Sequence, residues 1–174
     1  MRLPRHNRRM SPRGTSRPIL TLPDERLRSP SLSVKLPDRH LRRLVDEMVV
    51  TMRLANGIGL AAPQIGEPYR LAVVEVANQL FVLGNPTIVR QGAPLIDWEG
   101  CLSIPDRVAK VARASEIVIA ADDIEGRHVK YRGRGLLARA FQHEIDHLAG
   151  RLYTDLVEPE EVVDTREHPG APSG

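Results

Sequence analysis

The chain has 174 residues and a formal net charge of +3, with 41% hydrophobic and 27% charged residues. These values predict one soluble domain that is large enough to bury a core. No apolar run approaches the roughly 20 residues of a membrane span, and no apolar segment follows the N-terminus, so we expect neither a membrane protein nor a secretory signal. The single cysteine, Cys101, excludes an intrachain disulfide and fits a reducing compartment.

Residues 1–18 carry six arginines and no acidic residue. We interpret them as a disordered basic arm, whose first nine residues would result from an over-long start assignment if Met10 were the true start of the protein. Organellar transit peptides are likewise rich in arginine and poor in acid, and an arm of this kind can also contact RNA. Because three prolines and a glycine within the arm would interrupt the amphipathic helix of a transit peptide, we prefer the first interpretation and expect the protein in the cytoplasm.

The next segment predicts an extended stretch followed by a helix. Residues 19–34 are rich in proline and serine and are expected to run extended over the surface. Asp38 is typical of a helix start, and Asn56-Gly57 of a helix end. Between them, apolar side chains recur every three or four residues and predict one buried face: Leu41, Leu44, Val45, Met48, Val49 and Met52.

The middle of the chain predicts short strands separated by turns and loops. Residues 57–66, GIGLAAPQIG, are expected to form a loop of small residues, and residues 97–105, DWEGCLSIP, a second loop at a functional site. Five segments are typical of strands, the last two paired as a hairpin: residues 71–76, 80–83, 87–89, 117–121 and 127–131. The expected fold class is α+β, with short, mostly antiparallel strands packed around a central helix.

That central helix, over residues 135–148, contains the sequence QHEIDH. His143 and His147 are four residues apart, so they lie on the same face of a helix and can both reach one metal ion. Glu144 directly follows the first histidine and would lie beside the metal without binding it, where it can move protons to and from a water molecule. The pattern H-E-x-x-H therefore predicts a metal-dependent hydrolase.

A catalytic metal site of this type uses three protein ligands and leaves one position open. Cys101 is the natural third ligand, because Gly100 beside it lets backbone approach a ligand closely and a thiolate binds metal strongly. One cysteine and two histidines suit Fe(II), Zn(II), Ni(II) or Co(II), so the residues predict one divalent ion without identifying it. We also expect the carboxylates of Glu99 and Asp146, with Arg113 as their cationic partner, to orient the ligands.

The end of the chain turns acidic and proline-rich after residue 156. We therefore expect a catalytic domain over residues 19–157 and a flexible tail over residues 158–174.

Three motifs in this chain resemble the signatures of the peptide deformylase family: GIGLAAPQ at residues 57–64, EGCLS at 99–103 and QHEIDH at 142–147. They occur in the family's order, and the likeness extends from about residue 19 to residue 156. The resemblance implies a hydrolase that removes the formyl group from the N-terminal formylmethionine of newly made polypeptides and releases formate. It implies N-formylmethionyl nascent peptides as partners and a transient contact with the ribosome. We expect no membrane partner and no sequence-specific nucleic acid.

Matching motif positions, the resemblance also implies a role for each site residue. The metal, natively Fe(II) in this family, is bound by Cys101, His143 and His147. The catalytic groups are Glu144 as general acid and base, with the side-chain amide of Gln64 and the backbone N–H of Leu102 stabilising the oxyanion. The substrate pairs with the backbone of Ile58, Gly59 and Gly100. A zinc peptidase is disfavoured because cysteine is rarely its third ligand; a catalytically weak deformylase-like protein that binds metal or the ribosome is disfavoured because Glu144, Gln64 and Cys101 are all present.

Overall fold

The computed structural model describes residues 14–167 as two α-helices, eight strands and four short 3-10 helices. The helices and strands are α1 (Arg39–Leu54), β1 (Gly59–Ala61), β2 (Leu71–Val76), β3 (Gln79–Gln91), β4 (Pro94–Cys101), β5 (Ile104–Ala114), β6 (Glu116–Asp122), β7 (His128–Arg134), α2 (Leu136–Leu148) and β8 (Val163–Asp164). The 3-10 helices are η1 (Glu25–Arg28), η2 (Ala62–Ile65), η3 (Tyr153–Leu156) and η4 (Pro159–Glu161).

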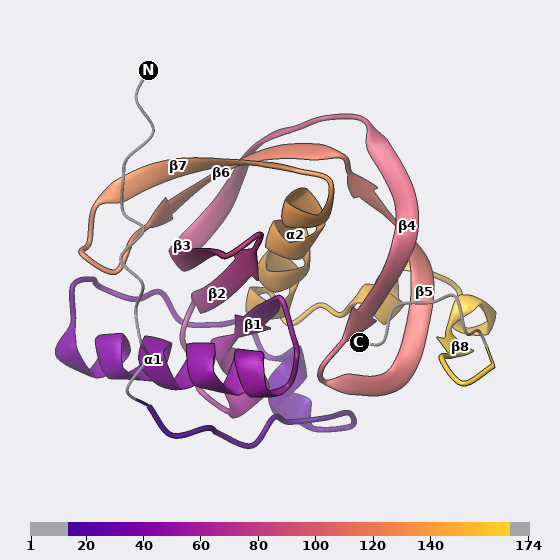
Figure 1. The fold of residues 1–174 in the computed structure, drawn as a ribbon, viewed down its shortest axis with the longest axis horizontal. Coiled ribbons are helices and arrows are strands. Elements are labelled where there is room, and N and C mark those ends of the chain that lie inside the picture. Colours follow the sequence, from indigo (N-terminus) through magenta and orange to yellow (C-terminus); the bar gives the residue numbers. More distant parts are fainter. Residues whose placement is uncertain (1–13, 168–174) are drawn as a thin grey trace.

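The strands form two antiparallel sheets, one of five strands in the order β1-β2-β3-β6-β7 and one of three in the order β4-β5-β8. Helix α2 lies in the centre of the molecule, with the β4–β5 hairpin on one side and the larger sheet on the other (Figure 1). This arrangement confirms the predicted α+β class with a central helix. Neither helix of the described region is long and apolar enough to cross a membrane.

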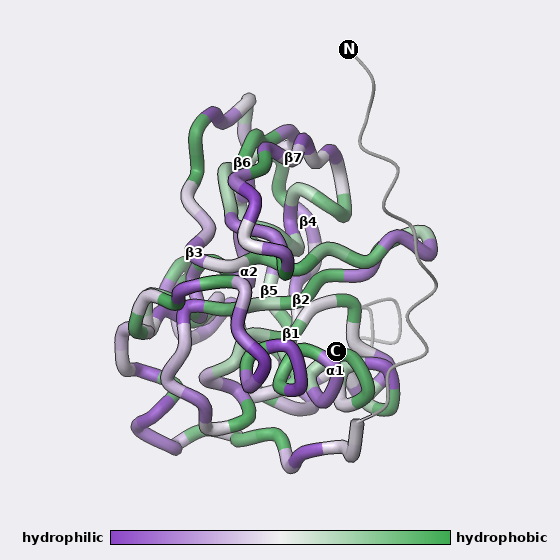
Figure 2. The backbone as a smooth tube through the Cα atoms, turned by 90° about the vertical axis from the view of Figure 1, so that its left-hand side faces the viewer, coloured by the Kyte–Doolittle hydropathy of each residue, from purple (hydrophilic) through white to green (hydrophobic). Residues whose placement is uncertain are grey.

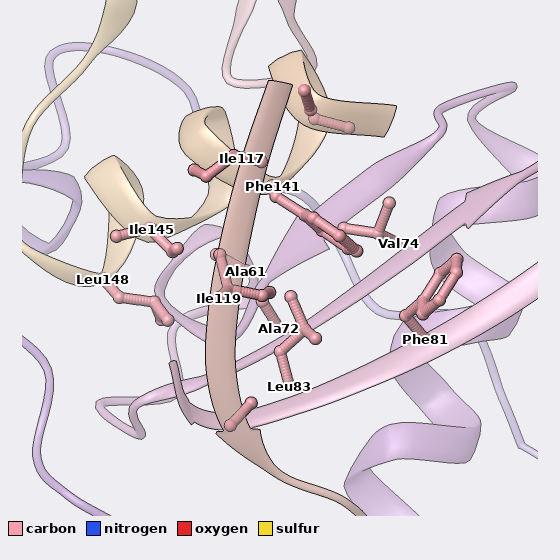
Figure 3. Packing of buried hydrophobic residues seen from close by; sticks show 13 residues of the cluster. Ala61, Ala72, Val74, Phe81, Leu83, Ile117, Ile119, Phe141, Ile145 and Leu148 are labelled. Carbon is pink, nitrogen blue, oxygen red and sulfur yellow. The ribbon is translucent and has the colours of Figure 1, made fainter. Parts of the chain in front are cut away.

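The sheet is buried on both faces where β1, the first four residues of β2 and residues 81–84 of β3 lie side by side, because a helix covers each face there. Leu60, Val73 and Val82 pack with the apolar stripe of α1, whereas their neighbours Ala61 and Ala72 pack with Phe141 and Ile145 of α2 (Figure 3). Successive residues of a strand point to opposite faces, so burial on both sides requires a continuous apolar run such as that of β2. The face of α2 that does not pack on this sheet points toward β4 and carries the two histidines.

The predicted start and stripe of α1 are confirmed. The Asp38 side chain accepts a hydrogen bond from the backbone N–H of Leu41, as an N-cap does. The six apolar side chains of the stripe are all buried. Asn56, just past the helix end, has a positive φ of 55°.

Both predicted loops are wrong, because each contains a strand. Residues 57–66 include β1, which pairs with β2, and then η2. Residues 97–105 belong to a hairpin in which β4 pairs with β5 over nearly its whole length. Glu99, within the predicted loop, is buried in this hairpin against Arg113 of β5. A turn was expected between the predicted strands 80–83 and 87–89, but β3 continues through residues 84–86. Its pairing with β6 shifts register there instead.

The two ends of the described region pack on the domain. The backbone N–H of Arg17 donates to Thr51 Oγ1, and its guanidinium pairs with Glu47 and Glu67, each over 2.9 Å. The part of the expected tail up to Asp164 is structured instead: η4 is followed by β8, which pairs with β5. The predicted boundaries at residues 18 and 158 therefore do not coincide with the ends of packed structure. Residues 1–13 and 168–174 of the predicted arm and tail lie outside the described residues.

Candidate active site

Three candidate metal ligands from two distant segments meet at one point. Helix α2 presents His143 and His147 from successive turns, and Cys101 is the last residue of β4. The Cys101 Sγ lies 3.2 Å from His147 Nε2, which lies 3.1 Å from His143 Nε2. All three donor atoms lie within 4.8 Å of one another. The predicted convergence of the thiol with the histidine pair is therefore present in the structure.

The three side chains fit a single divalent ion. Two nitrogen atoms that are each bound about 2.0–2.1 Å from one tetrahedral ion lie about 3.3 Å apart, close to the separation of the two Nε2 atoms here. Cys101 and His147 are buried, and His143 is almost so. Sulfur and imidazole nitrogen together suit Fe, Zn, Ni and Co rather than Mg or Ca.

Glu99 orients His143 by contacting the imidazole nitrogen that faces away from Cys101 and His147. Its Oε1 lies 2.6 Å from His143 Nδ1, which leaves Nε2 free to face Cys101. The same carboxylate accepts hydrogen bonds from Arg113 and Arg139 over 2.7 and 2.9 Å. Burial by itself would raise the pKa of Glu99, but hydrogen bonds from His143 and Arg113 hold that pKa well below its usual value. Glu99 is therefore an anion buried among cations.

The orienting role expected for Asp146 rests on the same arginine. Arg113 Nη1 lies 2.5 Å from Asp146 Oδ2, and Arg151 pairs with the other oxygen of Asp146 over 2.7 Å. Arg113 thus ties β5 to α2 and, through Glu99, to β4. Arg139, one turn before His143 on α2, is a member of this buried cluster that the sequence analysis did not select.

We expect Glu99→Gln to weaken both the fold and the metal site. Arg139 would lose its anionic partner and Arg113 one of its two, and breaking a buried ion pair typically costs about 3–5 kcal/mol of unfolding free energy. Loss of the outer partner of a metal-binding histidine typically weakens metal binding about 10- to 100-fold. Urea unfolding and metal competition with a chelator measure the two effects. The matched control is Glu116→Gln, whose carboxylate pairs with Arg132 and Arg134 at the surface; an equal loss in both variants would contradict the prediction.

Glu144 lines the same pocket as Cys101 and His143 and is almost completely buried, at 3% exposure. Its Oε2 has no hydrogen-bond partner among residues 14–167. Burial raises the pKa of Glu144 to about 7. Gly59 of β1 makes room for this carboxylate, because a Cβ at position 59 would lie 2.2 Å from Glu144 Oε1.

Gln64 presents the nitrogen end of its amide to the site. The backbone N–H of Ala61 donates to Gln64 Oε1 over 2.9 Å, which fixes the orientation of the amide. Its Nε2 then lies 3.7 Å from Cys101 Sγ and 3.1 Å from Ser103 Oγ, the acceptor for one of its two hydrogens. Ser103 also donates its backbone N–H toward Cys101 Sγ over 3.4 Å. Ser103 was not among the predicted site residues, although it lies within the EGCLS motif.

The site opens into a pocket of about 280 Å³. Its lining includes every predicted metal-binding, catalytic and substrate-binding residue except His147: Ile58, Gly59, Gln64, Gly100, Cys101, Leu102, His143 and Glu144. It also includes residues that were not predicted as site residues, among them Asn56, Trp98, Leu136 and Arg139. Leu136 lies seven residues before His143, two turns along the helix, which is the periodicity that could have selected it.

The chain matches known proteins over most of its length. The polypeptide deformylase family model matches residues 16–162. A peptide deformylase of Dictyoglomus thermophilum is 43% identical over 151 residues, which cover 87% of this chain and 98% of that protein. One from Heliobacterium modesticaldum is 47% identical over 146 residues, covering 82% of this chain and 97% of the relative.

Solved structures agree with the sequence matches. The crystal structure of a peptide deformylase from Legionella pneumophila has a TM-score of 0.82 at 41% identity, covering 84% of this chain and 89% of that one. The enzyme from Synechococcus elongatus, in complex with actinonin, has a TM-score of 0.79 at 39% identity, covering 90% and 85%. The chain therefore belongs to the peptide deformylase family, the metal-dependent hydrolases that remove the N-formyl group from newly made polypeptides.

Proposed function

We propose that Cys101, His143 and His147 hold the single divalent ion of this enzyme, natively Fe(II), and that Glu144, Gln64 and Leu102 act on the formyl amide beside it. The observation that carries the proposal is the meeting of one thiol and two imidazole nitrogens within 4.8 Å, next to a buried carboxylate and at the edge of a pocket. When bound there, a divalent ion supplies Lewis-acid chemistry, which polarises a carbonyl oxygen and acidifies water. Fe(II) follows from the family resemblance, and the mixed sulfur and nitrogen donors are compatible with it.

Glu144 is the proposed general base and then general acid. Amide hydrolysis must remove a proton from the attacking water and deliver one to the departing nitrogen, and a single carboxylate can do both in turn. A pKa raised to about 7 by burial lets Glu144 exchange a proton readily near neutral pH. Its Oε2, which lacks a partner among residues 14–167, is the oxygen available for that exchange.

Gln64 and Leu102 are the proposed stabilisers of the oxyanion. The Gln64 amide donates from a fixed orientation, because its oxygen is occupied by the backbone N–H of Ala61. A donor that is already oriented loses little free energy to reorganisation when negative charge develops on the formyl oxygen. Leu102 follows Cys101 at the turn between β4 and β5 and lines the same pocket, so its backbone N–H is the proposed second donor.

The edges of the two sheets are proposed to bind the peptide. Strand β1 is an edge of the larger sheet and β4 an edge of the smaller one, and both border the pocket. Extended peptides commonly add to an open sheet edge through backbone hydrogen bonds. Ile58 and Gly59 would supply these bonds on the β1 side and Gly100 on the β4 side.

We expect Gln64→Leu to lower kcat about 10²- to 10³-fold with little change in bound metal, because one well-placed oxyanion donor is lost. Gln64→Glu keeps an acceptor for the Ala61 N–H but removes the donor, so it is expected to be similarly slow. Gln91→Leu, at an exposed position of β3, is the control. Steady-state kinetics and metal analysis check the prediction, and unchanged kcat in the first variant would contradict it.

The direct test of the function is formate release from an N-formylmethionyl tripeptide, run without oxygen on protein loaded with Fe(II) or Ni(II). We expect turnover with either metal and none after chelation. Stoichiometric metal binding without formate release would favour the catalytically weak alternative. The proposed setting is the cytoplasm, with nascent chains as substrates and transient contact with the ribosome.

A further inference from the structure

The outer face of the larger sheet carries a row of basic side chains that the catalytic site does not use. Strand β7 exposes Lys130, Arg132 and Arg134, which alternate with inward-facing residues such as Tyr131. Two strands away, β3 exposes Arg90. These four residues are called the basic face below. Figure 2 shows hydrophilic stretches along the β6–β7 hairpin that carries three of them.

Strand register brings the four cations together. Arg90 is paired with Val118 of β6, and Val118 is paired with Arg132 of β7, so the two arginines flank one valine across three strands. Between them lies a surface hollow of about 210 Å³, lined by both arginines, Val118 and Glu116. Lys130 and Arg134 lie two residues on either side of Arg132 and therefore on the same face.

The charge of this face is not balanced. Glu116 accepts hydrogen bonds from both Arg132 and Arg134, over 2.7 and 3.0 Å, so one carboxylate serves two guanidinium groups. Arg90 and Lys130 have no ion-pair partner among residues 14–167. At the far end of β6, Asp122 is already paired with His128 and accepts a hydrogen bond from Asn85. A surplus of positive charge therefore remains over the three strands.

Protection of a sheet edge explains only part of this pattern. Charged residues on an edge strand discourage pairing with other chains, and β7 is such an edge. Arg90 lies on the part of β3 that extends past β2 and pairs only with β6. Edge protection does not, however, require that Arg90 and Arg132 stand in register on one face and line the same hollow.

We propose that the basic face is a docking surface for the phosphate backbone of RNA. Adjacent strands are about 4.8 Å apart, and alternate residues of one strand are about 6.6–6.8 Å apart. The four cations are therefore spread over a surface, and they match a chain of phosphates better than one small anion. Lysine and arginine contacts to phosphates need no particular base sequence. The inference rests on the proposed function, since a protein that acts on nascent chains works beside ribosomal RNA.

The placement of the basic face leaves catalysis free. Helix α2 packs on the inner face of the same sheet through Phe141 and Ile145, and His143 and His147 are not part of that packing. None of the four basic residues lines the catalytic pocket. RNA bound to this face would therefore leave the pocket open to a peptide.

The test compares two triple variants of the full chain that remove the same charge. Arg90→Gln, Lys130→Gln and Arg132→Gln neutralise the basic face; Lys35→Gln, Arg39→Gln and Arg43→Gln neutralise three exposed cations at and before α1. Binding of a fluorescently labelled structured RNA is followed by anisotropy between 50 and 200 mM salt. We expect the first triple variant to bind at least about 10-fold more weakly at 50 mM salt than the second, with a salt slope smaller by about 2–3. Both variants should deformylate the tripeptide at the wild-type rate.

Equal RNA affinity in the two triple variants would overturn the proposal. So would a loss confined to vesicles that contain an anionic phospholipid, which would make the face a membrane contact. If the first triple variant fails to fold, it is replaced by the double variant Arg90→Gln and Lys130→Gln, which breaks no ion pair. This double variant is compared with Arg39→Gln plus Arg43→Gln. Because deformylation is assayed separately, RNA binding without turnover would refute the proposed function, and turnover with unchanged RNA binding would refute only this inference.

Discussion

Glu144→Ala is expected to lower kcat for formate release about 10²- to 10⁴-fold, which is the usual contribution of a positioned general acid–base group. The expectation follows from geometry, since Glu144 lines the same pocket as Cys101 and His143 and its Oε2 has no hydrogen-bond partner among residues 14–167. Metal content should stay near one ion per chain, because Cys101, His143 and His147 are unchanged. Steady-state kinetics on metal-loaded protein, with metal analysis of the same sample, measure both quantities.

Glu144→Gln is the matched variant for this prediction. It keeps the size of the side chain beside Gly59 and removes only the ability to take up and release a proton. Both variants should therefore be slow, and the alanine variant should not be rescued by more metal. Turnover close to that of the wild type in either metal-loaded variant would eliminate Glu144 as the proton carrier.

Cys101→Ala is expected to remove the bound ion and, with it, deformylation. The thiol is the only one of the three ligands that comes from outside α2, so two imidazoles would remain on one helix face. The loss of metal affinity should exceed the about 10- to 100-fold that removal of an outer partner costs. Metal titration followed by formate release at each metal concentration measures it.

Ser103→Ala is the control for the cysteine variant. It lies two residues from Cys101, removes a hydroxyl that accepts from Gln64, and leaves the thiol in place. We expect it to retain one ion per chain. Circular dichroism shows whether each variant is folded. A folded Cys101→Ala protein that binds metal as tightly as the wild type would show that the sulfur is not a ligand.

Features that depend on neighbours along the chain could be predicted from the sequence. His143 and His147 lie on one face of α2 because residues four apart always do so on a helix, whatever surrounds them. The Asp38 cap and the apolar stripe of α1 are local in the same sense. Cys101 was selected by the chemistry of metal ligands and by family motifs, and its position 46 residues from His147 could not be derived from any local pattern.

Features that depend on distant partners could not be predicted in this way. A loop was predicted at residues 97–105, and no element was predicted over most of β5. The burial of Glu99 against Arg113 could not be foreseen, because a charged residue is rarely buried unless it finds a partner, and strand register sets that partner. Trp98 and Arg139 reach the pocket only because the hairpin folds against α2.

The amino-acid sequence alone determined the helix that carries the histidines, the identity of the three donor groups and the α+β class, because helical periodicity and ligand chemistry are properties of the residues themselves. Only the tertiary structure decided that the hairpin carries the thiol to that helix, that Glu99 is buried among cations, and that Arg90 and Arg132 share one face. These outcomes depend on the pairing of strands far apart in the chain, and the free energy that selects one register comes from burial and charge pairing across the whole domain.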